Sequence, residues 1–462
     1  MNIGFIKYKG ETYHIYIKMF SPDDKTEVLS LLTQHFDILV WENVIQLEII
    51  NTLHDHILTG KLIYRDDAQA VLNYFMERPV VYLDISLTKL QNKNISPGEI
   101  ALPEKEFSHR FLVENINNIS TNQNEQIMAM SLISDDLWCF TANLNYSTFT
   151  KASVGGAVTS DSKYTTLIEE SPINILSELY KQVGLTLNTN KVETKTACRY
   201  VTNIGENLLS AEPFLLKRAF NIRDLQSPGM VSIYYNILLK EYSLVRLNRL
   251  INNDPSIEKK TGDVYADKVI KIEIYNQYMA DLDAEDKNTL KIVNIKNNTE
   301  LFELLQPCDF HQYDYITNTF SNEKNIDILP AIPVLKGKDY QKKYYTIRNM
   351  ISKVNDLDKL NYNRVTSTWH NPIFFNNDIL NLLLNSTVAV VETNGCLERS
   401  PGDPILLVVD RTDNNPLYKT NGEWSCFKVH HIFGPSSYKN KLLLGRFSIN
   451  NESIPKTIQM GA

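Results

Sequence analysis

Short runs in which apolar and polar residues alternate dominate both ends of the sequence, and they restrict the fold to one built mainly of β-strands. In the N-terminal third, these runs cover residues 1–20, 43–52, 59–65, 79–87, 107–116 and 127–134. In the C-terminal third, they cover residues 387–393, 404–410, 423–432 and 440–448. A period of two places successive side chains on opposite faces of a strand. Short strands with a single helix, at 23–36, favour a closed or nearly closed small β-barrel over an open sheet.

The middle of the chain has a mixed pattern. Residues 171–185 begin with Ser171 as a cap and Pro172 at the first helical position, and they predict an amphipathic helix. A second helix is expected at 211–222, and strands at 229–239 and 267–276. Residues 280–300 are polar and predict a loop, whereas 376–386 predict a leucine-rich helix ahead of the C-terminal strands.

These patterns predict an α+β fold that is mostly β. We assign residues 1–150 to a small β-barrel and residues 361–450 to a second β-rich region. Residues 151–360 form a mixed α/β middle region, in one piece or discontinuous in space. Residues 451–462 have little to pack and form a C-terminal tail.

Composition excludes several classes of protein. With 43% hydrophobic and 22% charged residues in 462, the chain is globular and not intrinsically disordered. The net charge of −7 lacks the basic excess of a dedicated nucleic-acid binder. Five scattered cysteines without a CxxC pattern indicate reduced thiols. We find neither a signal-peptide core nor a stretch of about 18 apolar residues, so we expect folding in a cytoplasm and no membrane span.

Histidine pairs are the first candidates for chemistry. His54 and His56 have the spacing of a metal-binding pair on a strand, but they fall in an expected turn without a third ligand nearby. A polar hairpin tip is therefore the favoured interpretation. His430 and His431 are adjacent in an expected strand and point to opposite faces, so one is expected in the core and the other exposed.

The remaining candidates also have a plain structural interpretation. The glycine-bearing stretch 153–163 matches neither phosphate-binding pattern, and we expect a surface loop. The adjacent carboxylates Asp66-Asp67 and Asp135-Asp136 are expected in solvated turns. No hydrolase, zinc-protease or zinc-finger signature occurs. We therefore predict no catalytic residue, no cofactor and no metal site.

The turn after the leucine-rich helix can be explained residue by residue. Pro401 fixes φ and Gly402 accepts a positive φ, so the pair reverses the chain. Asp403 is expected to accept hydrogen bonds from the amides of its own turn. The resulting hairpin exposes a strand edge, and such edges are normally covered.

Taken in order, this turn and the hairpin after it resemble the tail-hub family of phages and related contractile machines. The nearest match is the baseplate hub subunit of contractile-tailed phages, which is related to type VI secretion spike-base and late-control hub proteins. The matching positions are Gly395, Pro401, Gly402, Asp403, Trp424, Val429, His431, Tyr438, Leu442 and Leu444, with either His430 or His431 as the family's histidine.

The N-terminal third is similar to the same family. Residues Leu58–Asp66 match a signature in which an excursion leads to a strand that ends in aspartate. Residues 109–120 and 125–138 resemble the paired strands that complete the family's first barrel. The resemblance covers about 1–150 and 370–450, and the middle of the chain has no match.

The resemblance implies a structural and non-enzymatic role in a virion tail, assembled in the host cytoplasm. Three subunits with two tube-type barrels each would form a homotrimer that presents six barrels to the hexameric tail tube and a threefold face to the trimeric central spike. Other baseplate proteins would surround it, and viral DNA would pass transiently through its channel. The alternative is a tail-associated carbohydrate-binding protein or hydrolase, which would show a pocket with converging carboxylates and aromatic rings.

Overall fold

The computed structural model describes twenty stretches of the chain. They are residues 4–8, 11–22, 41–53, 55–66, 69–90, 104–122, 125–145, 148–149, 171–189, 200–202, 204–219, 231–246, 291–297, 308–314, 319–326, 348–354, 387–397, 399–407, 422–435 and 437–446. The helices predicted at 23–36 and 376–386, the strand at 267–276, the loop at 153–163 and the tail at 451–462 lie outside them.

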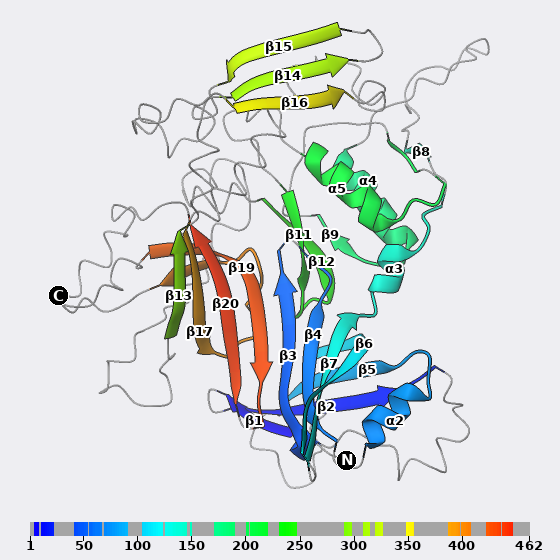
Figure 1. The fold of residues 1–462 in the computed structure, drawn as a ribbon, viewed down its shortest axis with the longest axis vertical. Helices are drawn as coiled ribbons and strands as arrows, with labels where there is room; N and C mark the ends of the chain where they lie inside the picture. The colour runs from blue at the N-terminus through cyan, green and yellow to red at the C-terminus, as the bar shows by residue number, and fades with distance from the viewer. Residues whose placement is uncertain are drawn as a thin grey trace, which may run out of the picture.

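One twelve-stranded sheet contains the strands of both chain ends (Figure 1). Its order is β1-β2-β5-β6-β7-β4-β3-β19-β20-β17-β13, and β18 pairs beside β19. The strands are β1 Gly4–Tyr8, β2 Glu11–Phe20, β3 Val44–Thr52, β4 Thr59–Arg65, β5 Tyr82–Leu90, β6 Glu104–Asn122, β7 Glu125–Ser134, β13 Lys291–Asn297, β17 Thr387–Asn394, β18 Pro404–Leu407, β19 Gly422–Phe433 and β20 Tyr438–Arg446.

The sheet contains the same arrangement of five strands twice. We call β3 to β7 the first unit, and β13 with β17 to β20 the second unit. The spatial order of the first unit is β3-β4-β7-β6-β5, and that of the second is β13-β17-β20-β19-β18. Every neighbouring pair is antiparallel in both units. Because the order along the chain also agrees, the two units share one topology.

A β-bulge lies at the same place in both units and fixes their register. In the first unit it falls between Val113 and Asn115 of β6, and in the second between Cys426 and Lys428 of β19. Val113 pairs with Leu132, and Cys426 pairs with Leu444. A bulge bends its strand and raises the local twist, so two bulges at matching positions give the two units a similar bend.

Matching positions of the two units are buried alike. Following the pairs outward from the bulges equates Phe111 with Trp424, Met130 with Leu442, Leu132 with Leu444, Leu62 with Val391, and Leu83 with Ile405. All ten side chains are almost fully buried. Those of the second unit form a core cluster of their own, whereas those of the first share a larger cluster with the middle region. Two units with one topology therefore have separate hydrophobic centres.

The two units are joined edge to edge. Residues Lys428–Phe433 of β19 pair antiparallel with Leu47–Thr52 of β3. Among the described strands no sheet closes on itself, so the predicted pair of separate barrels is not seen there. The first unit does not close into a barrel of its own because β3, the strand at its border, pairs with the second unit instead. The sheet is nevertheless strongly curled, since β1 and β2 run crosswise below β3 and β1 reaches β20 (Figure 1).

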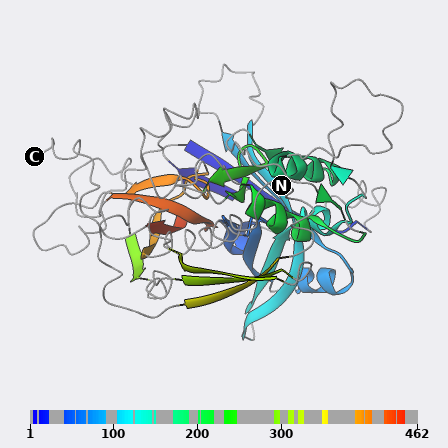
Figure 2. The same ribbon diagram turned by 90° about the horizontal axis from the view of Figure 1, so that it is seen from above.

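Where the structure describes it, the middle region contains both helices and short sheets. Helix α3 (Leu137–Thr141) leads out of the first unit to α4 (Pro172–Gln182) and α5 (Leu208–Arg218). The sheet β11-β12-β9 (Val231–Asn236, Glu241–Arg246 and Leu187–Asn188) and the short pair β10-β8 (Tyr200–Val201 and Thr148–Phe149) accompany them. Figures 1 and 2 both show α4 and α5 at the side of the molecule away from β13 and β17.

Five further elements complete the described chain. A 3₁₀ turn, η1 (Trp41–Asn43), precedes β3, and helix α2 (Ala70–Met76) follows β4. A separate sheet has the order β15-β14-β16. Its strands are β14 Cys308–Asp314, β15 Thr319–Ile326 and β16 Arg348–Val354.

The loop predicted over 280–300 is wrong for the residues of β13. This strand pairs with β17 and belongs to the second unit, although it lies within the stretch assigned to the middle region. Its alternation is hidden by polar neighbours in the sequence. Val293 and Ile295 are also exposed, so these two apolar residues do not mark a buried face from which a strand could be recognised.

Gly60 provides a direct test of the β3–β4 contact. A Cβ at this position would lie 2.7 Å from the carbonyl oxygen of Glu48, which is backbone and can move only with its strand. We expect Gly60→Ala to lower the free energy of unfolding by about 1–3 kcal/mol, because overpacking forces the two strands apart. Urea titration followed by circular dichroism measures this change. Lys61→Ala, on the next residue of the same strand, is the control and should cost less than about 0.5 kcal/mol.

Candidate functional site

The junction between the two units is the first candidate functional site. Besides the backbone ladder, His430 of β19 and Glu48 of β3 face each other, with 2.7 Å between Nε2 and Oε2. The hydrogen bond from His430 lowers the pKa of Glu48 against the opposing effect of partial burial. This side-chain pair and the backbone ladder together hold strands from opposite ends of the sequence in register.

Next to His430 on β19, His431 belongs to a buried polar network that lies among residues of the C-terminal third. Its Nδ1 lies 2.8 Å from the Tyr438 hydroxyl and 3.0 Å from Nδ2 of Asn440. The Oδ1 of Asn440 accepts from the amide of Cys396 at 2.6 Å and from Arg399 at 2.9 Å. These two donors fix the orientation of the Asn440 amide, so that Nδ2 donates to the imidazole. His431 is held as a neutral acceptor, not as a general base open to a substrate.

A glycine completes this network. The amide of Gly395 donates to the carbonyl of Tyr438 at 2.9 Å. A Cβ at residue 395 would lie 2.2 Å from Cγ of the Tyr438 ring, so only glycine fits against the ring. On its other side, Tyr438 stacks on Phe433 with 4.4 Å between ring centroids. Three residues singled out by their pattern, Gly395, His431 and Tyr438, thus meet in one place.

The reversal at Pro401-Gly402 has the geometry expected from its residues. Gly402 has a φ of +88°, and its amide donates to the carbonyl of Cys426 at 2.7 Å. The carboxylate of Asp403 accepts from the amide of Ser400 at 2.7 Å. Trp424 is buried in the core of the second unit and lies under the guanidinium of Arg446, 4.2 Å from the ring. The turn therefore has a structural role: it positions β18 against β19.

The other matching residues pack in the cores or belong to the strand pairs. Val429, Leu442 and Leu444 are buried in the cluster around Trp424. In the first unit, Leu58, Leu62 and Tyr64 are buried. Residues Thr59–Arg65 form β4, which pairs with β3 and β7. None of these side chains is arranged as a reactive group.

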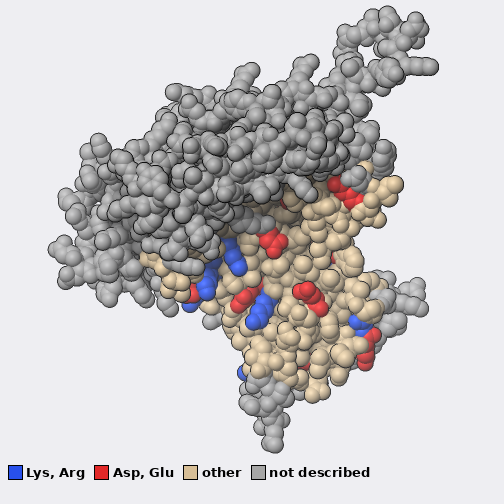
Figure 3. All heavy atoms as spheres, turned by 45° about the horizontal axis from the view of Figure 1, so that its top comes forward, with Lys and Arg blue, Asp and Glu red and all other residues tan. Residues whose placement is uncertain are grey.

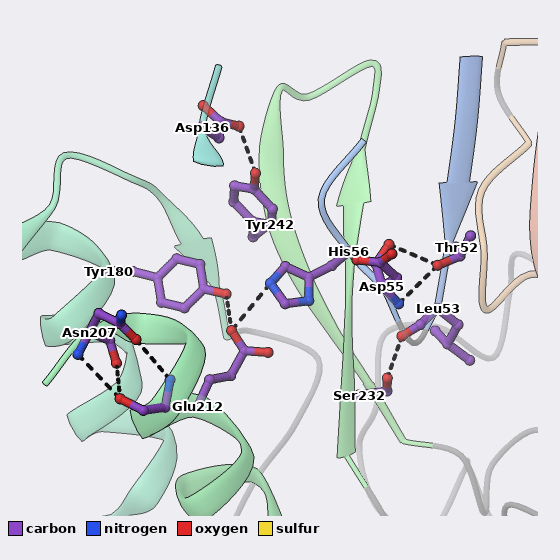
Figure 4. A network of polar contacts seen from close by, with 11 residues as sticks. Thr52, Leu53, Asp55, His56, Asp136, Tyr180, Asn207, Glu212, Ser232 and Tyr242 are labelled. Carbon is purple, nitrogen blue, oxygen red and sulfur yellow. Dashed lines mark hydrogen bonds and ion pairs between the residues drawn. The ribbon is translucent and has the colours of Figure 1, made fainter. Parts of the chain in front are cut away.

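The prediction of a polar hairpin tip is wrong for His56. The segment between β3 and β4 enters the middle region, where His56 is buried and its Nε2 lies 3.3 Å from Oε2 of Glu212 on α5 (Figure 4). The Tyr180 hydroxyl donates to the same Oε2 at 2.8 Å. Rings of Phe140 and Tyr242 pack beside the imidazole at 4.9 and 5.7 Å. The covering residues follow 84 or more positions later, so the local sequence gives no sign of this burial; His54 lies outside the described residues.

Hydrogen bonds to backbone carbonyl groups hold the same segment in place. Ser232 of β11 donates to the carbonyl of Leu53 at 2.6 Å, and Asn51 donates to that of Tyr235 at 2.6 Å. Thr52 and Asp55 close a small turn between them (Figure 4). These contacts connect β3, the strand at the junction, to the middle region on its other side.

The aspartates predicted in solvated turns have structural partners. Asp66 is buried, and its Oδ2 accepts from the amides of Val71 and Leu72 in the first turn of α2, where a negative charge is favoured. Asp136 accepts from the Tyr242 hydroxyl at 2.6 Å, and burial raises the pKa of its neighbour Asp135. The solvated-turn interpretation is wrong for Asp66 and Asp136; Asp67 lies outside the described residues.

In the described stretches, no group of three or more His, Cys, Asp or Glu side chains is placed to hold a metal ion. No helix in the same stretches is long and apolar enough to cross a bilayer. Cys139, Cys396 and Cys426 are free thiols.

No protein-family model and no curated protein matches the sequence. Three solved structures resemble the fold at low sequence identity. A tail protein from Neisseria meningitidis has a TM-score of 0.47 and 7% identity, with 93% of this chain and 96% of that one covered. The 43 kDa tail protein of prophage MuSo2 from Shewanella oneidensis has a TM-score of 0.44 and 8% identity, covering 98% and 100%. An Escherichia coli component of the type VI secretion system has a TM-score of 0.38 and 8% identity, covering 88% and 74%.

His431 makes the stability of the fold depend on pH. Burial, together with the charges of Arg399 and His430, lowers its pKa to about 3. In the unfolded chain this imidazole has an ordinary pKa near 6.5. Between pH 6.5 and 3, the unfolded chain therefore binds a proton that the folded chain does not bind. The neutral imidazole therefore makes its full contribution to the free energy of unfolding above pH 6.5. This contribution falls as the pH falls, and at pH 5 it is smaller by about 2 kcal/mol.

We expect His431→Gln to lose this dependence, because glutamine can accept from Asn440 without titrating. Urea titrations at pH 7.5 and pH 5 measure the free energy of unfolding of both proteins. The wild type should lose about 2 kcal/mol more than the variant between the two pH values. Equal losses would contradict the assignment of the buried, neutral imidazole.

Proposed function

We propose that this chain is a structural hub of a phage tail baseplate. It would act as a homotrimeric symmetry adapter that joins the hexameric tail tube to the trimeric central spike and forms part of the channel for the viral genome. The observation that carries this proposal is the repeated five-strand unit within one chain. Three copies of a chain with two like units present six of them, which matches a sixfold tube, while the complete assembly keeps threefold symmetry toward a spike.

The contacts in the chain suit an architectural role. The sequence features that resemble the hub family lie in the two units and not in the middle region. Where the structure describes them, their side chains pack in cores, close turns or fix the register of β19 and β20. The network around His431 is buried, and Nδ1 of His431 is hydrogen-bonded to neighbouring side chains. Such a network favours a rigid structural role over a reactive one. We therefore propose that the protein is not an enzyme and that its partners are the tube protein, the spike protein and other baseplate proteins.

The charge distribution suits a channel wall that DNA passes without being held. Figure 3 shows one face on which the described Lys, Arg, Asp and Glu side chains are interspersed and not gathered by sign. The net charge of the chain is −7. A strongly positive surface would bind phosphate and retain the genome. This proposal also places the protein in the virion tail, after assembly in the host cytoplasm.

The alternative of a carbohydrate-binding protein or hydrolase gains no support from the described residues. The cluster that combines aromatic rings with a carboxylate is the one of His56, Tyr180, Glu212 and Tyr242. Tyr180 and Tyr242 are almost fully buried, and burial raises the pKa of both hydroxyls. Rings in this position pack on one another and leave no face for a sugar.

The proposal predicts a specific stoichiometry. In purified tail particles, electron cryomicroscopy should locate three copies of this chain around the tail axis between tube and spike. With the isolated chain and its tube protein, light scattering after size exclusion should show three copies per ring of six tube subunits, and each contact of the chain with itself should bury roughly 2,000 Å² or more. A location off the axis, or binding to a saccharide array by a monomer that ignores the tube protein, would refute the hub.

A further inference from the structure

Three buried polar atoms lie around the side chain of Asn440, and none of them has a hydrogen-bond partner among the described residues. They are Nε of Arg399, Nε2 of His431 and Oγ1 of Thr393. Arg399 and His431 both contact the Asn440 amide, at 2.9 and 3.0 Å. Thr393 of β17 and His431 of β19 are each paired with Asn440 of β20, so the three side chains share one buried face of the sheet. Buried polar groups without a partner are rare, so three around one residue have a common cause.

All three groups can donate a hydrogen bond. Because Asn440 donates to Nδ1 of His431, the neutral imidazole carries its proton on Nε2, and this N–H is a donor. The Nε–H of Arg399 can only donate, and the hydroxyl of Thr393 can donate as well. What these atoms lack is therefore an acceptor, and no described residue supplies one.

The guanidinium of Arg399 also lacks a counterion. Its Nη1 donates to the carbonyl of Asn394 at 2.6 Å and to Oδ1 of Asn440, and both acceptors are neutral. Asp403, four residues later in the chain, directs its carboxylate to the amide of Ser400. In the described part of the chain, no carboxylate forms an ion pair with Arg399. A buried charge with only neutral partners is costly unless a charge of opposite sign lies beside it.

The local field is positive. The groups whose charges act on His431 are Arg399 and His430, and both lower its pKa; no carboxylate is among them. A small negative ion placed beside these donors is therefore attracted by the charge of Arg399 and meets no opposing carboxylate among the groups that act on His431.

We propose that Thr393, Arg399 and His431 bind a small monovalent anion, of the size of chloride, inside the second unit. Its charge offsets that of the guanidinium, and one spherical ion accepts from three donors at once. Thr393 is 2% exposed, Arg399 4% and His431 1%, so a ligand of more than a few atoms cannot reach them from solvent. A water molecule has only two lone pairs to offer and leaves the charge of Arg399 without a counterion.

The first unit shows that the fold itself does not require these polar residues. The position equivalent to Asn440 is Met128, and the one equivalent to Thr393 is Tyr64, which pairs with Met128 as Thr393 pairs with Asn440. Met128 is 1% exposed, so an apolar side chain fills the same place in the same topology. The polar set of the second unit therefore serves a purpose of its own, and a bound anion would join β17, β19 and the segment before the turn at Pro401.

Unfolding in matched salts tests the site at pH 7.5, where the imidazole of His431 is neutral. The full chain is titrated with urea in mixtures of sodium chloride and sodium gluconate at one constant ionic strength, because gluconate is too large to enter. A ligand that binds only the folded chain stabilises it by mass action. Once chloride exceeds its dissociation constant, a tenfold rise in chloride should lower the unfolding equilibrium constant about tenfold.

Three variants assign this response to the site. Arg399→Met removes the charge and should abolish the response to chloride. Thr393→Val keeps the shape of the side chain but removes one donor, and it should need at least threefold more chloride for the same response. Arg110→Met is the matched control, because Arg110 is half-exposed and paired with Asp84 at 2.8 Å; its response should equal that of the wild type.

A crystal grown in sodium bromide locates the ion directly. An anomalous peak in contact with Nε of Arg399 and Nε2 of His431 supports the inference, and it decides the matter together with Thr393→Val if Arg399→Met does not fold. Equal stability in chloride and gluconate, a response that Arg399→Met or Thr393→Val retains in full, or a site filled by water without anomalous signal overturns it. The inference does not rest on the hub function, so its failure leaves that proposal standing.

Discussion

The pairing of β3 with β19 is the interaction on which the rest of the structure depends. It joins strands that lie nearly 400 positions apart in the chain, and closing so long a loop costs conformational entropy that local contacts do not offset. The ladder alone is modest in energy, since each exchanged hydrogen bond contributes about 1 kcal/mol. Side chains therefore matter as well: His430 of β19 pairs with Glu48 of β3.

The position of β3 explains why its contacts hold the first unit, the second unit and the middle region together. Its two edges are taken by β4 and β19, while Asn51 and the residues just after the strand bond to β11 of the middle region. Phe427, the residue within the bulge of β19, packs against Leu53 and Tyr234. A bulge re-aims one side chain without changing the strand order. The bulge that the units share is thus used in the second unit to reach the middle region, whereas Glu114 at the same place in the first unit is exposed.

The sequence predicts strands well where one face is buried and the other is not. Residues 44–52 and 59–65 form β3 and β4 within one residue of the expected bounds. The turn at Pro401-Gly402-Asp403 was predictable because the three residues specify it locally. His56 and Asp66 were not, since burial of the first comes from α5 and other distant elements, and the second caps a helix that has too few residues to show a period. β13 was missed for a related reason, because its outward side chains are apolar and its flanks are polar.

The family resemblance implies two like units, but comparing the two parts of the sequence with each other does not reveal their shared topology, for a physical reason. Matching core positions hold residues of similar burial but different shape, such as Phe111 and Trp424, or Leu62 and Val391. A core accepts such exchanges when total volume and pattern are kept, so two units can keep one fold without recognisable sequence similarity. What must be kept is the register, because a slip by one residue would turn each buried set toward solvent. The matching bulges preserve it.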